Sequence, residues 1–201
     1  YNAAISACEK SGKWLRALSV LREMRKVTVL PNVVSYNAGI SVCESGGQWR
    51  HSFSLLGELS EVSLEADVIS YSSAMYGCSR RGEGRWQQAM SVLREMCERV
   101  DPNTFTAQSF NAFIWTCAQA GQWQHALSTL GAMRRVSLEP CALSYCATVS
   151  ACVKGGAWQL ALSLLRQMHE INLQPDTIGY LAGVAACEMT GRWQQALSWY
   201  D

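Results

Sequence analysis

The segment CEKSGKWLRAL, residues 8–18, decides the fold because its pattern of cysteine, glycine and tryptophan returns along the chain. Related segments are CESGGQWRHSF from Cys43, CAQAGQWQHAL from Cys117, CVKGGAWQLAL from Cys152 and CEMTGRWQQAL from Cys187. The recurrence has two interpretations: a reactive or metal-binding unit used several times, or a packing unit. The period of the pattern is the first property that helps to separate them.

Two series of aromatic residues define the repeat. Successive members are 35, 37, 37, 35 and 35 residues apart in the series Trp14, Trp49, Trp86, Trp123, Trp158 and Trp193. They are 35, 35, 39, 35 and 35 residues apart in the series Tyr1, Tyr36, Tyr71, Phe110, Tyr145 and Tyr180. We expect one repeat array with boundaries at residues 1–35, 36–70, 71–109, 110–144, 145–179 and 180–201. Because residue 201 falls inside the sixth repeat, we expect the chain to be part of a longer protein.

Each repeat has the pattern of two helices. In the first repeat, apolar residues recur three and four residues apart, which is typical of amphipathic helices. Gly12 separates the two helices, because glycine readily adopts the left-handed conformation that ends a helix, and Pro31 follows the second. Two short helices cannot bury their apolar faces alone. We therefore expect an all-α fold, an α-solenoid in which helix pairs stack and their first helices line a concave groove.

Composition excludes several classes of protein. Lysine and arginine number 17 against 16 aspartates and glutamates, so the chain is neither a basic nucleic-acid tail nor an acidic disordered segment. No run of ~18 apolar residues predicts a membrane-spanning helix. The sequence contains no nucleophile elbow, phosphate-binding loop, deaminase signature or paired catalytic carboxylates. We expect no enzymatic activity, no cofactor, no small-molecule substrate and no membrane partner.

The recurring cysteines and tryptophans favour the packing interpretation. Neighbouring helix axes lie ~8 to 10 Å apart, whereas a disulfide needs Cα atoms within ~7 Å. The sequence has no Cys-x-x-Cys pair, so a metal site is not expected. We expect one small buried thiol per repeat, fully buried tryptophans in the core, and solvated histidines on the surface.

The period and segments such as VVSYNAGISVCESGGQW and ALSVLREMRKVTVLPN resemble the pentatricopeptide repeat family in its 35-residue form. The resemblance covers the whole chain, and the recurrent tryptophan makes it a tryptophan-rich variant. It implies a right-handed solenoid that binds single-stranded RNA, one nucleotide per repeat. In that family, the residue after the aromatic and the residue just after the proline position together recognise one base.

The resemblance therefore assigns pairs of base-recognition residues. The pairs are Asn2 with Asn32, Asn37 with Asp67, Ser72 with Asn103 (or with Thr106, if the four extra residues of the third repeat shift the register), Asn111 with Cys141, and Cys146 with Asp176. By this analogy Asn with Asp favours uracil, Asn with Asn a pyrimidine, and Ser with Asn adenine. A thiol is a weak hydrogen-bonding group, so the fourth and fifth repeats have no assigned base. Helix capping alone is the alternative role for the residues after the proline.

The resemblance also assigns contacts to the two other parts of a nucleotide. Apolar residues two positions before the aromatic would sandwich the base, and these are Val34, Ile69, Leu143 and Ile178, with Gln108 as the polar exception. Basic residues near the end of the first helix would contact phosphate, and these are Lys10, Arg80 and Lys154. Only three of the six repeats carry a basic residue there, so we expect a shallow salt dependence of binding.

We therefore expect an RNA-binding solenoid that acts in organellar RNA processing, stability, editing or translation, in a mitochondrion or a chloroplast. Single-stranded RNA is the expected partner, together with other RNA-processing proteins. The alternative is a protein–protein interaction scaffold like the tetratricopeptide arrays, which the nearly balanced net charge favours.

Overall fold

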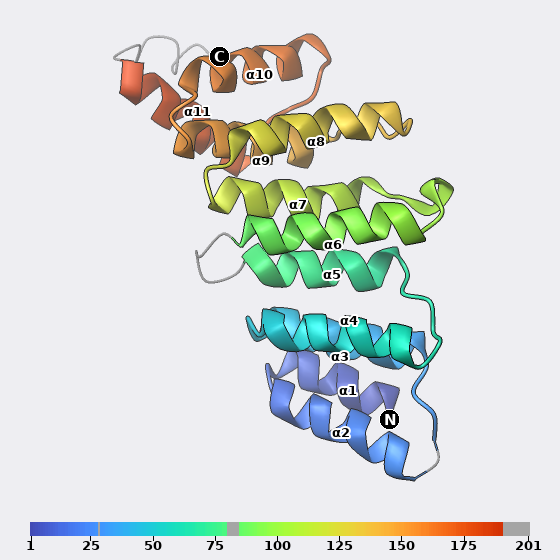
Figure 1. Cartoon of the computed structure of the whole chain (residues 1–201). Helices are drawn as coiled ribbons and strands as arrows, with labels where there is room; N and C mark the ends of the chain where they lie inside the picture. The colour runs from blue at the N-terminus through green and yellow to red at the C-terminus, as the bar shows by residue number, and fades with distance from the viewer. Residues whose placement is uncertain (28, 80–84, 191–201) are drawn as a thin grey trace. The chain divides into compact units, whose positions relative to one another are not determined.

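The structure, a computed structural model, describes residues 1–27, 29–79 and 85–190 (Figure 1). Within these residues every regular element is helical, as expected for an all-α fold. The elements are α1 (Asn2–Lys10), α2 (Trp14–Lys26), α3 (Val33–Ser45), α4 (Trp49–Glu61), α5 (Val68–Ser79), α6 (Trp86–Arg99), the 3-10 helix η2 (Pro102–Thr104), α7 (Ala107–Gln119), α8 (Trp123–Arg135), α9 (Ala142–Lys154), α10 (Trp158–Glu170) and α11 (Thr177–Thr190).

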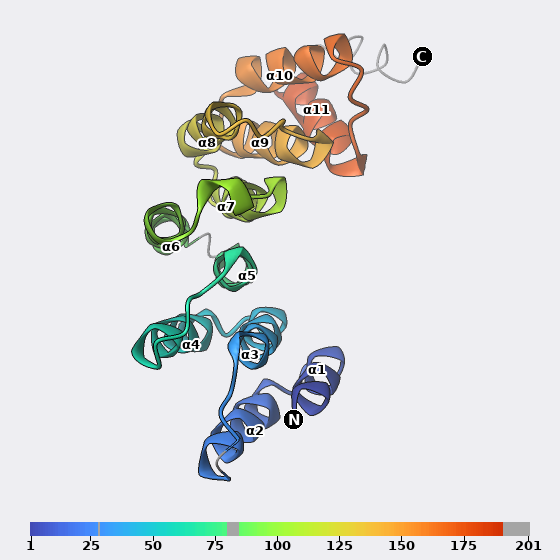
Figure 2. The same ribbon diagram turned by 90° about the vertical axis from the view of Figure 1, so that its right-hand side faces the viewer.

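The chain divides into two compact units. The first comprises Tyr1–Arg81 with Gln87–Phe105, and the second comprises Gly82–Trp86 with Thr106–Asp201. In the first unit, α3 packs against α1 and α5, while α2 and α4 lie on the other side (Figure 2). In the second unit, α9 packs in the same way against α7 and α11, and α8 and α10 pack against the first helices. Odd-numbered helices therefore stack on one another within each unit.

The turn between the two helices of a repeat contains a glycine in the left-handed conformation, as predicted. Gly12, Gly47, Gly121 and Gly156 all have positive φ angles, between 62° and 78°. A tryptophan begins each second helix from α2 to α10. The glycine ends the first helix without the steric cost that a Cβ atom would have, and the chain reverses into the second helix.

The cores of both units contain the repeated small residues. Cys8, Cys43, Cys78, Cys117, Cys152 and Cys187 are all buried and unbridged, which confirms the expected core thiols. Burial removes solvent that would stabilise a thiolate, and it raises the pKa of Cys43 to about 11 and that of Cys117 to about 12. Cys43 and Cys117 are therefore uncharged packing groups at neutral pH.

The tryptophans that begin α2, α4, α6, α8 and α10 are only half-buried, so the prediction of fully buried indoles is wrong for these residues, and Trp193 lies outside the described residues. Trp14 and Trp123 show where such a ring packs, which is against a glycine of the next repeat. A Cβ atom at Gly46 would lie 2.9 Å from Cδ1 of Trp14, and one at Gly155 would lie 2.5 Å from Cδ1 of Trp123. The indole therefore covers the end of the following first helix, where only glycine leaves it room. Its outer face is free to meet His51, which is exposed and whose ring centroid is 5.1 Å from that of Trp14.

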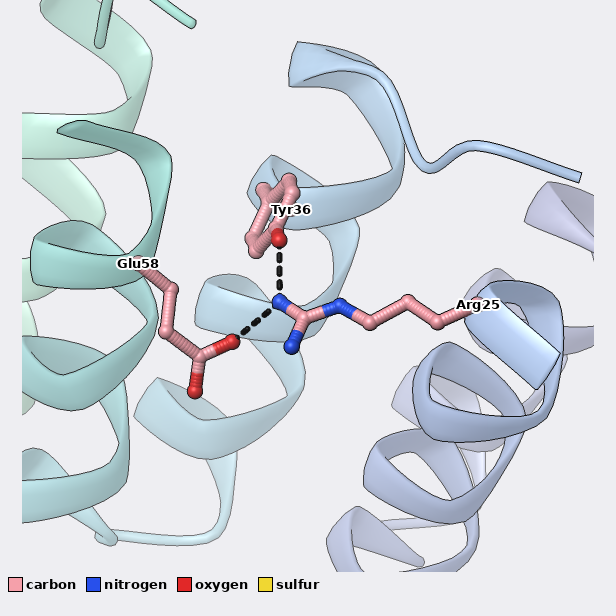
Figure 3. A network of polar contacts seen from close by, with 3 residues as sticks. All are labelled: Arg25, Tyr36 and Glu58. Atoms are coloured by element: carbon pink, nitrogen blue, oxygen red, sulfur yellow. Dashed lines mark hydrogen bonds and ion pairs between the residues drawn. The ribbon is translucent and has the colours of Figure 1, made fainter. Parts of the chain in front are cut away.

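A polar contact joins successive repeats beside the apolar core. Arg25 at the end of α2 donates to the hydroxyl of Tyr36 in α3 and to the carboxylate of Glu58 in α4 (Figure 3). Arg134 makes the same contact with the hydroxyl of Tyr145 in the second unit. The aromatic residue that defines the repeat thus packs its ring in the core and satisfies its hydroxyl with the preceding repeat, as a buried tyrosine requires.

Candidate nucleic-acid interface

The predicted base-recognition residues lie either inside a first helix or at the start of the next one. In α3, α5, α7 and α9 the residue after the aromatic is in the second turn of the helix. Outside the third repeat, the residue after the proline position directly precedes the next first helix. Asn32 shows the second kind: its Oδ1 accepts a hydrogen bond from the backbone N–H of Ser35 at 3.0 Å. The hydroxyl of Ser35 in turn accepts from the backbone N–H of Asn32 at 3.3 Å. Together these bonds form a reciprocal cap at the start of α3.

The second repeat shows how the two kinds of position meet. Nδ2 of Asn37 donates to both carboxylate oxygens of Asp67, at 3.0 and 3.1 Å. Oδ1 of Asn37 accepts from the hydroxyl of Ser70 at 2.5 Å. Asp67 also caps α5, because its Oδ1 accepts from the backbone N–H of Ser70 at 2.8 Å. The predicted pair is therefore brought into direct contact, and Ser70 contacts both of its members.

The same arrangement recurs in the first and fourth repeats. The hydroxyl of Ser35 donates to Oδ1 of Asn2 at 2.7 Å, which links Asn2 to the cap that contains Asn32. In the second unit, the hydroxyl of Ser144 donates to Oδ1 of Asn111 at 2.7 Å. Nδ2 of Asn111 is 3.5 Å from Sγ of Cys141. These three repeats therefore place an amide, a capping side chain and a serine hydroxyl in one network.

The fifth repeat lacks this network. Cys146 is completely buried, and Gly179 stands where the other repeats have the serine. Asp176 still caps the helix, since its Oδ1 accepts from the backbone N–H of Gly179 at 2.8 Å. Burial raises the pKa of Cys146 to about 12, with Asp176 close by. An uncharged buried thiol has little to offer a base, and the half-buried Asp176 is left as the polar group of this pair.

The third repeat differs because of its extra residues. Ser72 is 7% exposed, and its hydroxyl donates to the carbonyl of Ile69 within its own helix, at 3.2 Å. Asn103 lies in η2, where its side chain donates to Asp101 at 2.9 Å. The residue that caps α7 is Thr106. The helix boundary thus favours Thr106, the alternative in the sequence interpretation, over Asn103 as the residue equivalent to Asn32.

Capping and base recognition were alternatives in the sequence interpretation, and the structure shows that capping is present. Asn32, Asp67 and Asp176 all accept a backbone N–H bond at a helix start. Capping leaves part of the hydrogen-bonding capacity of the side chain available, because Oδ2 of Asp67 accepts only from Asn37 among the described contacts. The cap therefore fixes one side of the group and leaves lone pairs on the other.

The predicted base-sandwiching residues are exposed although they are apolar. Val34 and Ile69 are each 61% exposed, Leu143 is 42% exposed and Ile178 is 37% exposed. They are the second residue of their helices, beside the capping side chains. An exposed aliphatic side chain repeated next to a polar network is suited to packing on the face of a planar ring. Leu181, in the partial sixth repeat, is 65% exposed.

Only one of the three predicted phosphate contacts can be described. Lys154 at the end of α9 is exposed, and its Nζ donates to Oε1 of Gln119 at 2.9 Å. The side chain of Lys10 and the whole of Arg80 lie outside the described part of the chain.

Cys141 is the one thiol in this surface that is both exposed and hydrogen-bonded. Its partial burial favours the neutral thiol, but hydrogen bonds from Ser144 and Asn111 favour the thiolate more, so the pKa of Cys141 is lowered. It occupies the capping position of α9. The thiol therefore replaces an oxygen acceptor at this position.

The sequence interpretation missed Ser35, Ser70 and Ser144. Their signal was present, because a serine precedes the aromatic residue in four consecutive repeats and a glycine does so in the fifth. In the described residues no group of His, Cys, Asp or Glu could hold a metal ion. Among the same residues, no helix has the length and apolar character to span a membrane.

Comparisons with known proteins agree with this architecture. The pentatricopeptide repeat domain family matches residues 1–45 and 99–155, and the PPR repeat family matches residues 143–173. No curated protein matches the sequence. The crystal structure of the pentatricopeptide repeat protein PPR10 from maize is similar with a TM-score of 0.79 and 26% identity, over 100% of this chain and 28% of that chain.

Two structures of complexes are also similar. PPR10 in complex with an 18-nt psaJ RNA element has a TM-score of 0.70 and 24% identity, over 100% of this chain and 27% of that chain. The PPR domain of Arabidopsis thaliana protein-only RNase P 1 in complex with tRNA has a TM-score of 0.71 and 14% identity, over 95% of both chains. The chain thus spans between a quarter and a third of the length of PPR10. With the family matches covering more than half of its residues, this chain belongs to the pentatricopeptide repeat family.

Proposed function

We propose that this chain binds single-stranded RNA and that successive repeats contact successive bases. The observation that carries the proposal is the recurrence of one polar network, an asparagine with a capping side chain from the next repeat, beside an exposed aliphatic residue. Unstacked bases of single-stranded RNA expose hydrogen-bonding edges and flat faces, and this pair of groups suits both. The relatives solved with RNA support the same proposal.

The second repeat has the clearest preference for a base. Nδ2 of Asn37 carries two hydrogens, and one of them remains for a base when the other bonds to Asp67. The carboxylate of Asp67 remains an acceptor. A donor beside an acceptor can pair with a carbonyl oxygen and the N3–H group of uracil. The family resemblance assigns uracil to Asn with Asp, so we propose uracil for the pair Asn37 and Asp67.

The first repeat presents a different edge. Oδ1 of Asn32 is occupied by the cap of α3, and Oδ1 of Asn2 is occupied by Ser35. The N–H groups of both amides take part in none of the described hydrogen bonds, so they remain as donors. Two donors complement a pyrimidine edge with two acceptors, which cytosine offers through N3 and O2. The sequence analogy assigns a pyrimidine to this pair, and the geometry favours cytosine.

We propose that the chain acts by occupying a short RNA tract, without bond chemistry of its own, in an organellar RNA-processing pathway. A protein partner is the second candidate. Apolar residues that follow the second helices are exposed at the same point of four repeats, in the set Val27, Val62, Val136 and Ile171. Two of these residues lie in each unit, and either pair would suit a partner protein that binds on a different set of residues from the RNA.

Binding to short RNA oligomers tests the proposal. The oligomers differ at single positions, and affinity is measured by fluorescence anisotropy at fixed salt. We expect the oligomer with uracil opposite the second repeat to bind best, and Asp67→Asn to move this preference toward cytosine. Glu65→Gln, at an exposed site two residues away, is the matched control for loss of one negative charge. Equal affinity of the wild-type chain for all four bases at every position would reject base recognition.

A further inference from the structure

We propose that Ser35, Ser70 and Ser144 are positioning residues that decide which side of the neighbouring asparagine amide faces the RNA base. This inference rests on the proposed function, and it adds residues that the pairs of base-recognition residues do not include. The serine hydroxyls are buried beneath those pairs, so they act through the asparagine and do not touch the base themselves.

The direction of each serine hydroxyl follows from the helix cap. A backbone N–H donates to the hydroxyl oxygen, from Asp67 to Ser70 at 3.2 Å and from Cys141 to Ser144 at 3.2 Å. A hydroxyl that accepts this bond has a single hydrogen left to donate. Two acceptors lie within reach of this hydrogen in Ser70. Oδ1 of Asn37, at 2.5 Å, is nearer than Oδ1 of Asp67, at 2.9 Å, so the hydroxyl donates to the asparagine.

The amide is therefore held in one of its two orientations. Asp67 only accepts hydrogen bonds when ionised, so the nitrogen of Asn37 must face it, and Ser70 donates to the oxygen on the other side. Rotating the amide by half a turn would place Oδ1 against the carboxylate and Nδ2 against the hydroxyl. In the first repeat no carboxylate is present, and Ser35 alone selects the orientation of Asn2 among the described contacts.

Two repeats lack this arrangement and show what the serine adds. Ser109, at the same position of the helix in the third repeat, donates to the backbone carbonyl of Thr106 at 2.6 Å. The fifth repeat has Gly179 there, together with a thiol in place of the asparagine. Serine contact and an asparagine at the base-recognition position thus occur together in the first, second and fourth repeats. The serine is needed where an amide has to be oriented.

The consequence is a rule for specificity. An amide whose oxygen is fixed by the serine presents N–H, and it selects bases with an acceptor at the facing atom. An amide freed from the serine can present either oxygen or N–H, and it accepts both kinds of base. Loss of the serine should therefore relax selectivity at one nucleotide and leave the other nucleotides unaffected.

The test uses Ser35→Ala and Ser70→Ala in the full chain, with oligomers varied at the nucleotide opposite each altered repeat. We expect the preference at that nucleotide to fall about three- to tenfold, as for loss of one hydrogen bond that orients the group. Preference at the other nucleotides should stay constant. Ser70→Thr retains the hydroxyl and should restore the preference. Ser109→Ala is the matched control, because it removes a buried serine at the same position of a first helix whose hydroxyl donates to a backbone carbonyl and contacts no asparagine among the described hydrogen bonds.

A second measurement needs no RNA. The side-chain amide of Asn37 gives its own pair of nitrogen–proton resonances, and Ser70→Ala should shift them while Ser109→Ala leaves them unchanged. Full selectivity in Ser35→Ala and Ser70→Ala, while the wild-type chain is selective, would overturn the positioning role and leave the proposed function intact. A wild-type chain with no selectivity would overturn the proposed function. In that case unchanged Asn37 resonances in Ser70→Ala would reject the orientation of the amide as well.

Discussion

The sulfur of Cys146 occupies space that a side chain at position 179 would need: a Cβ atom on Gly179 would lie 2.5 Å from Cys146 Sγ. In the first, second and fourth repeats, the same two positions hold an asparagine and a serine in a hydrogen bond. The fifth repeat thus has a packed contact where the other three have a polar one. Either difference alone would leave a clash or an unpaired polar group.

The first prediction concerns this pair. Gly179→Ser alone should destabilise the chain by ~1 to 3 kcal/mol, because the hydroxymethyl group overlaps Cys146. Cys146→Asn alone should also destabilise it, because it buries an amide without its serine partner. The double variant rebuilds the pattern of the second repeat around Asp176, and it should be less destabilised than the sum of the two single variants. A double-mutant cycle from urea denaturation measures this coupling.

The result that would contradict this account is strict additivity of the two substitutions. Additivity would mean that the two positions do not share space or a hydrogen bond. The cycle Ser128→Ala with Ser163→Ala is a suitable control within the same unit, because each hydroxyl donates to a backbone carbonyl of its own helix. These two substitutions should add.

Much of this structure follows from the sequence, for a physical reason. The period of the tryptophans and glycines locates each turn, because a residue that ends or begins a helix affects only the few residues next to it. Helices begin at Trp14, Trp49 and Trp123, where the pattern predicts them. Trp14 is less buried than predicted, because it packs on Gly46 of the next repeat on one side and lies beside the exposed His51 on another. The role of Ser70 was missed because Asn37 and Asp67, which it contacts, are separated by 30 residues.

The second prediction concerns Cys141, the thiol at a capping position. Cys141→Asp gives Asn111 the same partner that Asn37 has in the second repeat, and it should create a preference for uracil opposite the fourth repeat. It should also stabilise the chain by ~1 kcal/mol, because aspartate is a better helix cap than a thiol. Cys141→Ala, which has no capping group, should be less stable than wild type. RNA-binding affinity and the midpoint of thermal unfolding, measured for the wild type, Cys141→Asp and Cys141→Ala, test these two expectations. A more stable Cys141→Asp chain without uracil preference would restrict this position to capping.

The third prediction compares two glycines of the second unit. A Cβ atom at Gly155 would lie 2.4 Å from the carbonyl oxygen of Gly121 and 2.5 Å from Trp123 Cδ1, so Gly155→Ala should destabilise the chain by ~1 to 3 kcal/mol. A Cβ atom at Gly131, in the middle of α8, would meet nothing within 4 Å. Gly131→Ala should therefore stabilise the chain by ~1 kcal/mol through its better helix propensity. Equal effects of the two substitutions on the midpoint of thermal unfolding would contradict the packing of Trp123 on the helix end.

The fourth prediction concerns the reactivity of the nine cysteines with iodoacetamide. The thiolate is the reactive form, so a lower pKa moves alkylation to lower pH. Cys141 is exposed and its pKa is lowered by Ser144 and Asn111, against the opposing effect of its partial burial. Cys97 is also exposed, but burial of its sulfur and the charge of Glu98 raise its pKa. Mass spectrometry across a pH series should show Cys141 modified at lower pH than Cys97.

The buried thiols give the comparison for this experiment. The pKa of Cys152 is raised to about 11 by burial, so the folded chain should protect it even at mildly alkaline pH. Adding urea should expose it to the reagent. Modification of Cys152 as fast as Cys141 in the folded chain would show that the core opens readily.

The fifth prediction concerns residues that end the second helices in a left-handed conformation. Ser137 has a φ angle of 58°, which is unfavourable for a residue with a Cβ atom and costs nothing extra for glycine. The backbone N–H of Ser137 bonds to the carbonyl of Arg134 at 3.1 Å, and glycine would keep that bond. Ser137→Gly should therefore stabilise the chain by ~0.5 to 1 kcal/mol, a gain that thermal unfolding can measure.

Two further substitutions separate this effect from a general effect of glycine. Asn172 has a φ angle of 56° at the same point of the next repeat, and asparagine tolerates this conformation better than serine. Asn172→Gly should therefore stabilise the chain less than Ser137→Gly. Ser128 lies inside α8, where glycine lowers helix stability by ~0.5 to 1 kcal/mol, so Ser128→Gly should have the opposite sign. If Ser137→Gly and Ser128→Gly both destabilise the chain, the left-handed turn is not under strain, and the flexibility of glycine in the unfolded chain outweighs its conformational freedom at the helix end.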